Sequence, residues 1–179
     1  MGVVEREAFE TEADGRAILR SLWEHHWWSV GLLLDEARAM SEEELTRSLP
    51  ISYGSYLGAL AHLIGSEMVW LMRVERDESP PTLPGIRELS SLPAVEREWH
   101  RCKEGWRAVL DSEDLGRTLS YRNTKGNEFR DPLWRVLTHL VDHGAAYRGT
   151  LIAALRNLGR TPPVTGLVFY TRQKGNDER

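Results

Sequence analysis

The amino-acid sequence predicts an all-α protein, a four-helix bundle with a small β-hairpin before the last long helix. Apolar residues recur with a helical period of about 3.6 residues in four long segments. A polar stretch with two short β-like runs separates the third segment from the fourth. A chain of 179 residues is long enough for one domain with its own core. We expect a single domain over residues 1–179, with a polar lead-in at 1–15 and a polar tail at 173–179.

The first predicted helix covers residues 16–40, where the apolar positions repeat on one face. Ser41 and Glu44 have the spacing of a capping box, which predicts a short helical turn that ends near Pro50. The second long helix begins after Ser55, a candidate N-cap. It carries His62, whose helical neighbours are all small: Gly58, Ala59, Gly65 and Ser66. These small residues should leave room beside the imidazole ring.

The second half of the chain begins with a loop at residues 79–85, which is rich in proline. A third helix is expected over 92–110, followed by a hairpin with strands at 118–122 and 128–130 around Gly126. The fourth helix, 133–156, follows Asp131 as candidate N-cap and Pro132 in the first turn. Gly159 is the expected residue beyond its C-terminal cap. The apolar run 167–170 should pack back on the bundle.

Composition excludes several classes of protein. The net charge of −4 gives no basic footprint for nucleic acid. The single cysteine, Cys102, cannot form an internal disulfide and suits a reducing compartment; as a small apolar side chain it is expected in the core. The acidic N-terminus does not resemble a signal peptide, and no apolar run reaches the ~20 residues that span a bilayer. We therefore expect a cytoplasmic protein without nucleic-acid or membrane partners.

His139 and His143 lie four residues apart, so their imidazole rings project from one face of the fourth helix. Two such rings can reach one cation, but a site needs further ligands. With His62 from the second helix, three neutral imidazoles would suit Zn, Ni, Fe or Mn and leave a coordination position open for a reactive ligand. Candidate carboxylates to accept their N–H groups are Glu24, Asp35 and Asp142. His pairs on helices are also often structural, so spacing alone leaves both interpretations open.

The sequence resembles the DinB-like superfamily of four-helix bundles over roughly residues 16–172. The matching segments are an aromatic-rich first helix with Trp27 and Trp28, the stretch 54–62 that leads into His62, the segment 132–150 of the fourth helix, and the closing motifs at 155–159, 162–163 and 169–170. Members commonly bind a divalent metal through one His of the second helix and two of the fourth. Characterised relatives include thiol-dependent transferases and a thiol-dependent isomerase, which use bacterial low-molecular-weight thiols.

One position departs from the family pattern. The family usually has His immediately before Arg-Gly-Gln, whereas this chain has Tyr147 there and Thr150 in place of Gln. Three arrangements follow. The metal is held by His62, His139 and His143, one turn earlier; or by His62 and His143 with Tyr147 as a weak ligand or proton donor; or the metal has been lost. We rank them in that order.

The resemblance implies a metal-dependent transferase in which a coordinated low-molecular-weight thiol attacks a small electrophile, with Tyr147 hydrogen-bonded to the reacting group. One alternative is a metal-dependent hydrolase, which would need a carboxylate base at the mouth of the site; Glu67 is the nearest candidate. Another is a non-catalytic bundle that binds a ligand or forms a homodimer and keeps a degenerate metal site. The seven tryptophans are expected in the core or at a dimer interface, with one or two at a ligand pocket.

Overall fold

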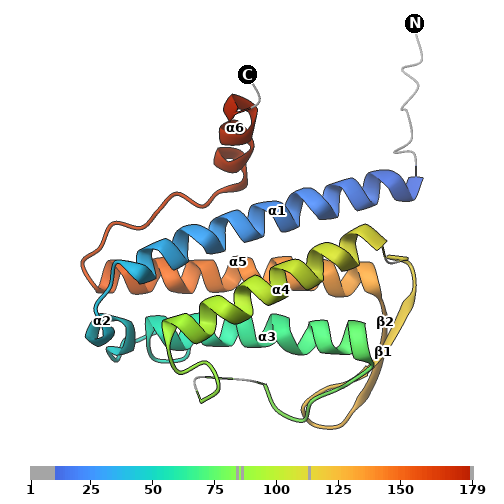
Figure 1. The fold of residues 1–179 in the computed structure, drawn as a ribbon, viewed down its shortest axis with the longest axis horizontal. Helices are drawn as coiled ribbons and strands as arrows, with labels where there is room; N and C mark the ends of the chain where they lie inside the picture. Colours follow the sequence, from blue (N-terminus) through green and yellow to red (C-terminus); the bar gives the residue numbers. More distant parts are fainter. Residues whose placement is uncertain (1–10, 84, 86, 113, 178–179) are drawn as a thin grey trace, which may run out of the picture.

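Four long helices pack side by side, and a two-stranded hairpin precedes the last of them (Figure 1). The computed structural model describes residues 11–177 except 84, 86 and 113. Its elements in order are α1 (Thr11–Arg38), α2 (Glu42–Thr46), α3 (Tyr56–Arg76), α4 (Leu92–Ser112), β1 (Thr118–Arg122), β2 (Glu128–Pro132), α5 (Leu133–Asn157) and α6 (Leu167–Asp177). The predicted all-α bundle with a hairpin before the last long helix is confirmed.

Each long helix of the bundle contacts two others: α1 and α3 both pack against α4 and against α5. The hairpin lies at the end of the bundle where α3 ends and α5 begins, and α2 lies at the opposite end (Figure 1). The core near α2 is built from aliphatic side chains together with Tyr56 and Trp99, whereas the core near the hairpin contains Trp23, Trp27 and Trp106. Cys102 is fully buried there, as expected.

Most residues of helix α3 are buried. Of the described residues, only this helix is long and apolar enough to cross a membrane by length and composition, but 78% of that apolar window is buried inside the protein. Because the bundle covers this helix, core packing is a sufficient explanation of its apolarity.

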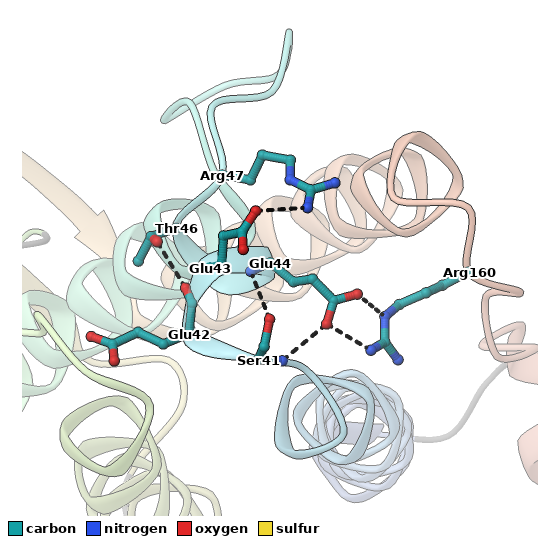
Figure 2. Close-up of polar contacts among 7 residues, drawn as sticks. All are labelled: Ser41, Glu42, Glu43, Glu44, Thr46, Arg47 and Arg160. Atoms are coloured by element: carbon teal, nitrogen blue, oxygen red, sulfur yellow. Dashed lines mark hydrogen bonds and ion pairs between the residues drawn. The ribbon is translucent and has the colours of Figure 1, made fainter.

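The capping box predicted before α2 is present and, at the α2 end of the bundle, links the chain after α1 to the chain after α5 (Figure 2). The Glu44 backbone N–H donates to Ser41 Oγ at 3.2 Å, and the Ser41 backbone N–H donates to the Glu44 carboxylate at 2.9 Å. That carboxylate also pairs with Arg160, beyond the end of α5, at 3.0 Å, and Arg160 donates to the Ala39 carbonyl at 2.8 Å. Hydrogen bonding and charge from Arg160 lower the pKa of Glu44 to about 2.

The loop before α3 turns tightly onto the first turn of that helix. Ser55 is the N-cap, as predicted, and accepts from the Gly58 backbone N–H at 3.0 Å. Tyr53 has a positive φ of 66°, which is uncommon for a residue with a side chain. A Cβ at position 58 would lie 2.3 Å from the Tyr53 carbonyl oxygen, so only glycine allows this approach. The turn thus holds Tyr53 over the first part of α3.

Three features of the helices differ from the sequence-based expectation: the start of α1, the N-cap of α5 and the presence of α6. Helix α1 begins at Thr11 rather than near residue 16. The N-cap of α5 is Pro132, not Asp131, because Asp131 pairs with Leu119 in the hairpin and its carboxylate accepts from Tyr121 and Arg135. The run at 167–170 forms α6, which contacts α1 through a hydrogen bond from Tyr170 to Glu24. Gly159, with φ 74°, follows the end of α5 as predicted.

Candidate functional site

Helices α3 and α5 are antiparallel neighbours, so their facing side chains pair in reverse order (Figure 1). The rings of His62 and Tyr147 are 4.7 Å apart between centroids, and those of Trp70 and His139 are 5.9 Å apart. His62 and Trp70 are eight residues apart on α3, as are His139 and Tyr147 on α5. This register places Tyr147, and not a histidine, directly opposite His62.

His62 is enclosed by aromatic rings. Tyr53 stacks on it at 3.9 Å between centroids, and the Tyr53 hydroxyl lies 3.2 Å from His62 Nε2, within hydrogen-bonding distance. The Ser66 hydroxyl lies 3.4 Å from the same nitrogen. Burial, assisted by the nearby His143, lowers the pKa of His62 to about 4. The imidazole is therefore neutral at pH 7, the form that can bind a metal.

His143 lies beside both His62 and Tyr147. Its ring centroid is 5.4 Å from that of His62 and 4.6 Å from that of Tyr147. Burial is the first cause that lowers the pKa of His143, and His139 adds to the effect. The buried Nδ1 of His143 has no hydrogen-bond partner among the described residues. Burial, together with a hydrogen bond to Tyr53, raises the pKa of Tyr147 to about 12, so its hydroxyl keeps its proton at neutral pH.

His139 lies further along α5, toward the hairpin. Its ring centroid is 6.0 Å from that of His143, but the residue opposite it on α3 is Trp70. Positions 62 and 70 are separated by about 12 Å along the helix axis, at 1.5 Å per residue. Across the described part of the chain, no three side chains of His, Cys, Asp or Glu are arranged to hold a metal ion. The structure thus brings together His62, His143 and Tyr147, and places His139 at the edge of this group.

A cavity of about 230 Å³ opens beside these histidines. From α3 and α5 it is lined by His62, His143, His139, Ser66, Trp70, Arg73 and Leu140, and from the loops by Leu83, Asn123 and Thr124. None of these described lining residues is acidic. A larger cavity of about 590 Å³ lies against the hairpin, around Tyr121, Phe129 and Arg130. It contains no histidine, so we place the candidate site at the smaller cavity.

A buried polar pair supports the floor of the site. His26 on α1 and Glu67 on α3 are joined by a contact of 2.9 Å between Nε2 and Oε1, and their side chains are 1% and 2% exposed. His26 also packs against α5, where a Cβ at position 144 would lie 2.4 Å from its Nδ1. The three helices that surround the site are therefore fixed to one another by His26, Glu67 and Gly144.

The predicted carboxylate acceptors lie elsewhere. Glu24 binds Tyr170 and Lys174, and Asp35 pairs with Arg38 on the surface. Asp142 is exposed. Burial raises the pKa of the Cys102 thiol, so Cys102 is no nucleophile. Of the seven tryptophans, one or two of which were expected at a ligand pocket, Trp70 lines the cavity. Sequence reasoning missed Tyr53 and Arg73: Tyr53 is placed by the turn before α3, and Arg73 by its contact with Arg122 in the hairpin.

The residues present fit a cation held by two imidazoles. Two rings that share one ion have centroids up to about 6.4 Å apart, given N–metal distances of about 2.0–2.1 Å. His62 and His143 satisfy this limit, and both are neutral at pH 7. The buried, unpaired Nδ1 of His143 shows a polar group without its partner in the described structure. Tyr147 is the nearest additional donor; the full set would need solvent or substrate atoms.

We expect the metal-free protein to lose stability as the pH falls from 6.5 toward 4. Because the pKa of His62 is lowered from 6.5 to about 4, the unfolded chain binds more protons than the folded chain in this window. The loss should be on the order of 1 kcal/mol for a half-buried ring. Urea unfolding of chelator-treated protein across this window would measure it. The variant His62→Gln should show a shallower dependence on pH; an unchanged slope would contradict the assignment.

Comparison with known proteins gives one family. The model described as DinB family matches residues 11–178, nearly the whole chain. No curated protein matches the chain.

Proposed function

The chain belongs to the DinB family, which is generally associated with metal binding, and from this membership and the geometry above we propose a metal-dependent thiol transferase that acts on a small electrophile. His62 and His143 would hold a divalent metal (Zn, Ni, Fe or Mn), with His139 or Tyr147 as third donor. The observation that carries the proposal is the pairing of two neutral imidazoles from separate helices, 5.4 Å apart, beside a cavity.

The register between α3 and α5 favours Tyr147 over His139 near that pair. The Tyr147 ring lies within 4.7 Å of His62 and 4.6 Å of His143, whereas His139 lies near His143 alone. With a pKa of about 12, the Tyr147 hydroxyl is suited to donate a hydrogen bond to a reacting group. His139, which is exposed at the cavity, would become a ligand only if its side chain turned toward His62.

The bound metal would have one chemical role: it would hold a thiol as thiolate near neutral pH. In the transfer, the sulfur–carbon bond forms as the bond from carbon to its leaving group breaks, and the leaving group departs with the electron pair. The thiol proton passes to solvent. The chain's residues would act on the thiol and the electrophile in two ways. The Tyr147 hydroxyl would orient the reacting group, and the cavity walls from α3 and α5 would exclude water.

The hydrolase alternative has less support. It needs a carboxylate base at the mouth of the site, and the candidate Glu67 is buried against His26 instead. A non-catalytic homodimer remains the competing proposal, supported by the exposed apolar side chains Leu167, Val168 and Phe169 on α6. We also propose a cytoplasmic location, a small-molecule substrate, and no nucleic-acid or membrane partner.

Elemental analysis of the purified protein tests the metal site. We expect about one equivalent of metal in the wild type and a loss of at least about tenfold in affinity for His62→Ala and for His143→Ala, since each removes a ligand. If Tyr147 is the third donor, the variant His139→Ala should retain metal. If His139 is the third donor, the variant Tyr147→Phe should retain metal. Substoichiometric metal, together with unchanged thermal unfolding on addition of Zn or Ni, would instead favour the non-catalytic bundle.

Activity is tested separately on the metal-loaded protein. Consumption of monochlorobimane that requires both an added low-molecular-weight thiol and the metal would support the transferase. Turnover of esters or amides without thiol would replace it with the hydrolase.

A further inference from the structure

Arg73 on α3 is buried, with 5% of its surface exposed, and within the described chain it faces aromatic rings and a carbonyl group. Its guanidinium lies over the Trp70 ring at 4.4 Å and over the Tyr121 ring at 5.2 Å. One nitrogen donates to the Arg122 carbonyl oxygen at 2.8 Å. Its buried Nε has no partner among the described residues, and no described Asp or Glu forms an ion pair with it. The charge is held by two aromatic faces and one neutral acceptor.

Such an arrangement is costly unless an anion completes it. A buried charge without a paired and hydrogen-bonded partner loses its hydration without full compensation. Aromatic faces offset part of that loss through cation–π attraction, and they also fix the plane of the guanidinium. A fixed planar fork of N–H donors matches a carboxylate better than it matches a spherical anion.

Arg73 lines the same cavity as His62 and His143. Trp70 connects Arg73 to the histidines, because its ring contacts both the guanidinium and the His139 ring. The other polar lining groups of the described chain, from Ser66, Asn123 and Thr124, are neutral. Arg73 is the one arginine or lysine among the described lining residues, so it supplies the cavity with a permanent positive charge. The cavity, of about 230 Å³, has room for a molecule of a few carbon atoms.

We propose that this cavity binds a small molecule that carries a carboxylate, with the carboxylate on Arg73 and the reactive end toward His62 and His143. The inference rests on the proposed function and adds the chemical class of the ligand. It also gives the hairpin a role, because Asn123 and Thr124 cover the carboxylate end of the cavity.

The test is direct binding of succinate and of its neutral analogue succinamide to the full chain, by calorimetry, with and without metal. We expect Arg73→Gln to weaken succinate binding by at least about tenfold, since it removes a charge-assisted pair, and to leave succinamide binding unchanged. Arg76→Gln, an exposed arginine on the same helix, is the charge-matched control and should bind succinate as the wild type does. Thermal unfolding checks that each variant is folded.

Equal succinate affinity in the wild type and Arg73→Gln, or no preference of the wild type for succinate over succinamide, would overturn the proposal. Should Arg73→Gln fail to fold, the Arg73 Nε–H resonance of the wild type replaces it: succinate should shift that resonance, and an unmoved resonance overturns the proposal. The carboxylate could belong to the thiol or to the electrophile. Comparing the binding of mercaptoacetate and mercaptoethanol to the wild type and to Arg73→Gln distinguishes these two sources. An Arg73-dependent preference assigns the carboxylate to the thiol, and its absence assigns it to the electrophile.

The outcomes separate the two proposals. Arg73-dependent succinate binding in a protein that takes up no metal would leave the carboxylate site in place and remove the transferase. Metal uptake with thiol-dependent turnover, but succinate binding independent of Arg73, would support the transferase and remove the carboxylate site.

Discussion

Replacing Glu67 by leucine is expected to lower the free energy of unfolding by about 3–5 kcal/mol, the range for breaking a buried pair by removing one partner. Glu67 and His26 are almost completely buried, and Oε1 of Glu67 is the only partner of His26 Nε2 in the described structure. Leucine would leave that nitrogen in an apolar interior without a hydrogen bond. Urea unfolding at neutral pH, followed by far-UV circular dichroism, measures the loss.

Two further variants separate the pair from simple packing. Glu67→Gln keeps a hydrogen-bonding oxygen for His26 and should lose less stability than Glu67→Leu. The double variant His26→Leu with Glu67→Leu removes both polar groups and should recover part of the loss, so a double-mutant cycle gives the coupling. Additive effects of the two single changes would show that the pair contributes no coupling.

Adding one methyl group at Gly144 is expected to cost about 1–3 kcal/mol, although alanine is the better helix former. A Cβ at this position would lie 2.4 Å from His26 Nδ1 and 2.5 Å from His26 Cε1. The imidazole cannot withdraw easily, because its other nitrogen is bound to Glu67. Either α5 moves away from α1, or the His26–Glu67 contact lengthens. Chemical denaturation of Gly144→Ala measures the cost.

Gly149 on the same helix is the matched control. A Cβ there meets no atom within 4 Å in the described structure, so Gly149→Ala should raise stability by about 0.5–1 kcal/mol through helix propensity alone. Opposite signs for the two substitutions are the expected result. A stabilised Gly144→Ala would mean that α5 and His26 separate without cost.

Most of the fold could be predicted because its determinants are local. Helical periodicity indicated the four long helices, and the caps at Ser41 and Ser55 depend on residues three positions away. The prediction of Asp131 as the N-cap of α5 was wrong because contacts with residues more than three positions away decide the start of this helix. The backbone N–H groups of Leu133 and Trp134, at the start of α5, donate hydrogen bonds to the carbonyl oxygens of Arg117 and Leu115. No side-chain cap is therefore needed there.

The candidate site could be predicted only in part. Spacing of four along one helix shows which side chains share a face, and this placed His139, His143 and Tyr147 together. It does not show what lies opposite, which depends on how α3 and α5 align. That alignment puts Trp70 opposite His139. Tyr53 reaches His62 by a different route, the tight turn before α3. The His26–Glu67 pair joins residues 41 positions apart and has no local signal.

The reverse pairing of α3 and α5 has a consequence for how the chain tolerates insertions and deletions. One residue added between His139 and Gly144 would rotate the rest of α5 by about 100° and shift it by about 1.5 Å. Tyr147 would then turn away from His62, and Gly144 away from His26, while every side chain type was preserved. The tip of the hairpin turn, residues 125–127, does not line the cavity and carries no such phase constraint. Changes in length should therefore accumulate in that turn and be excluded from the middle of α5.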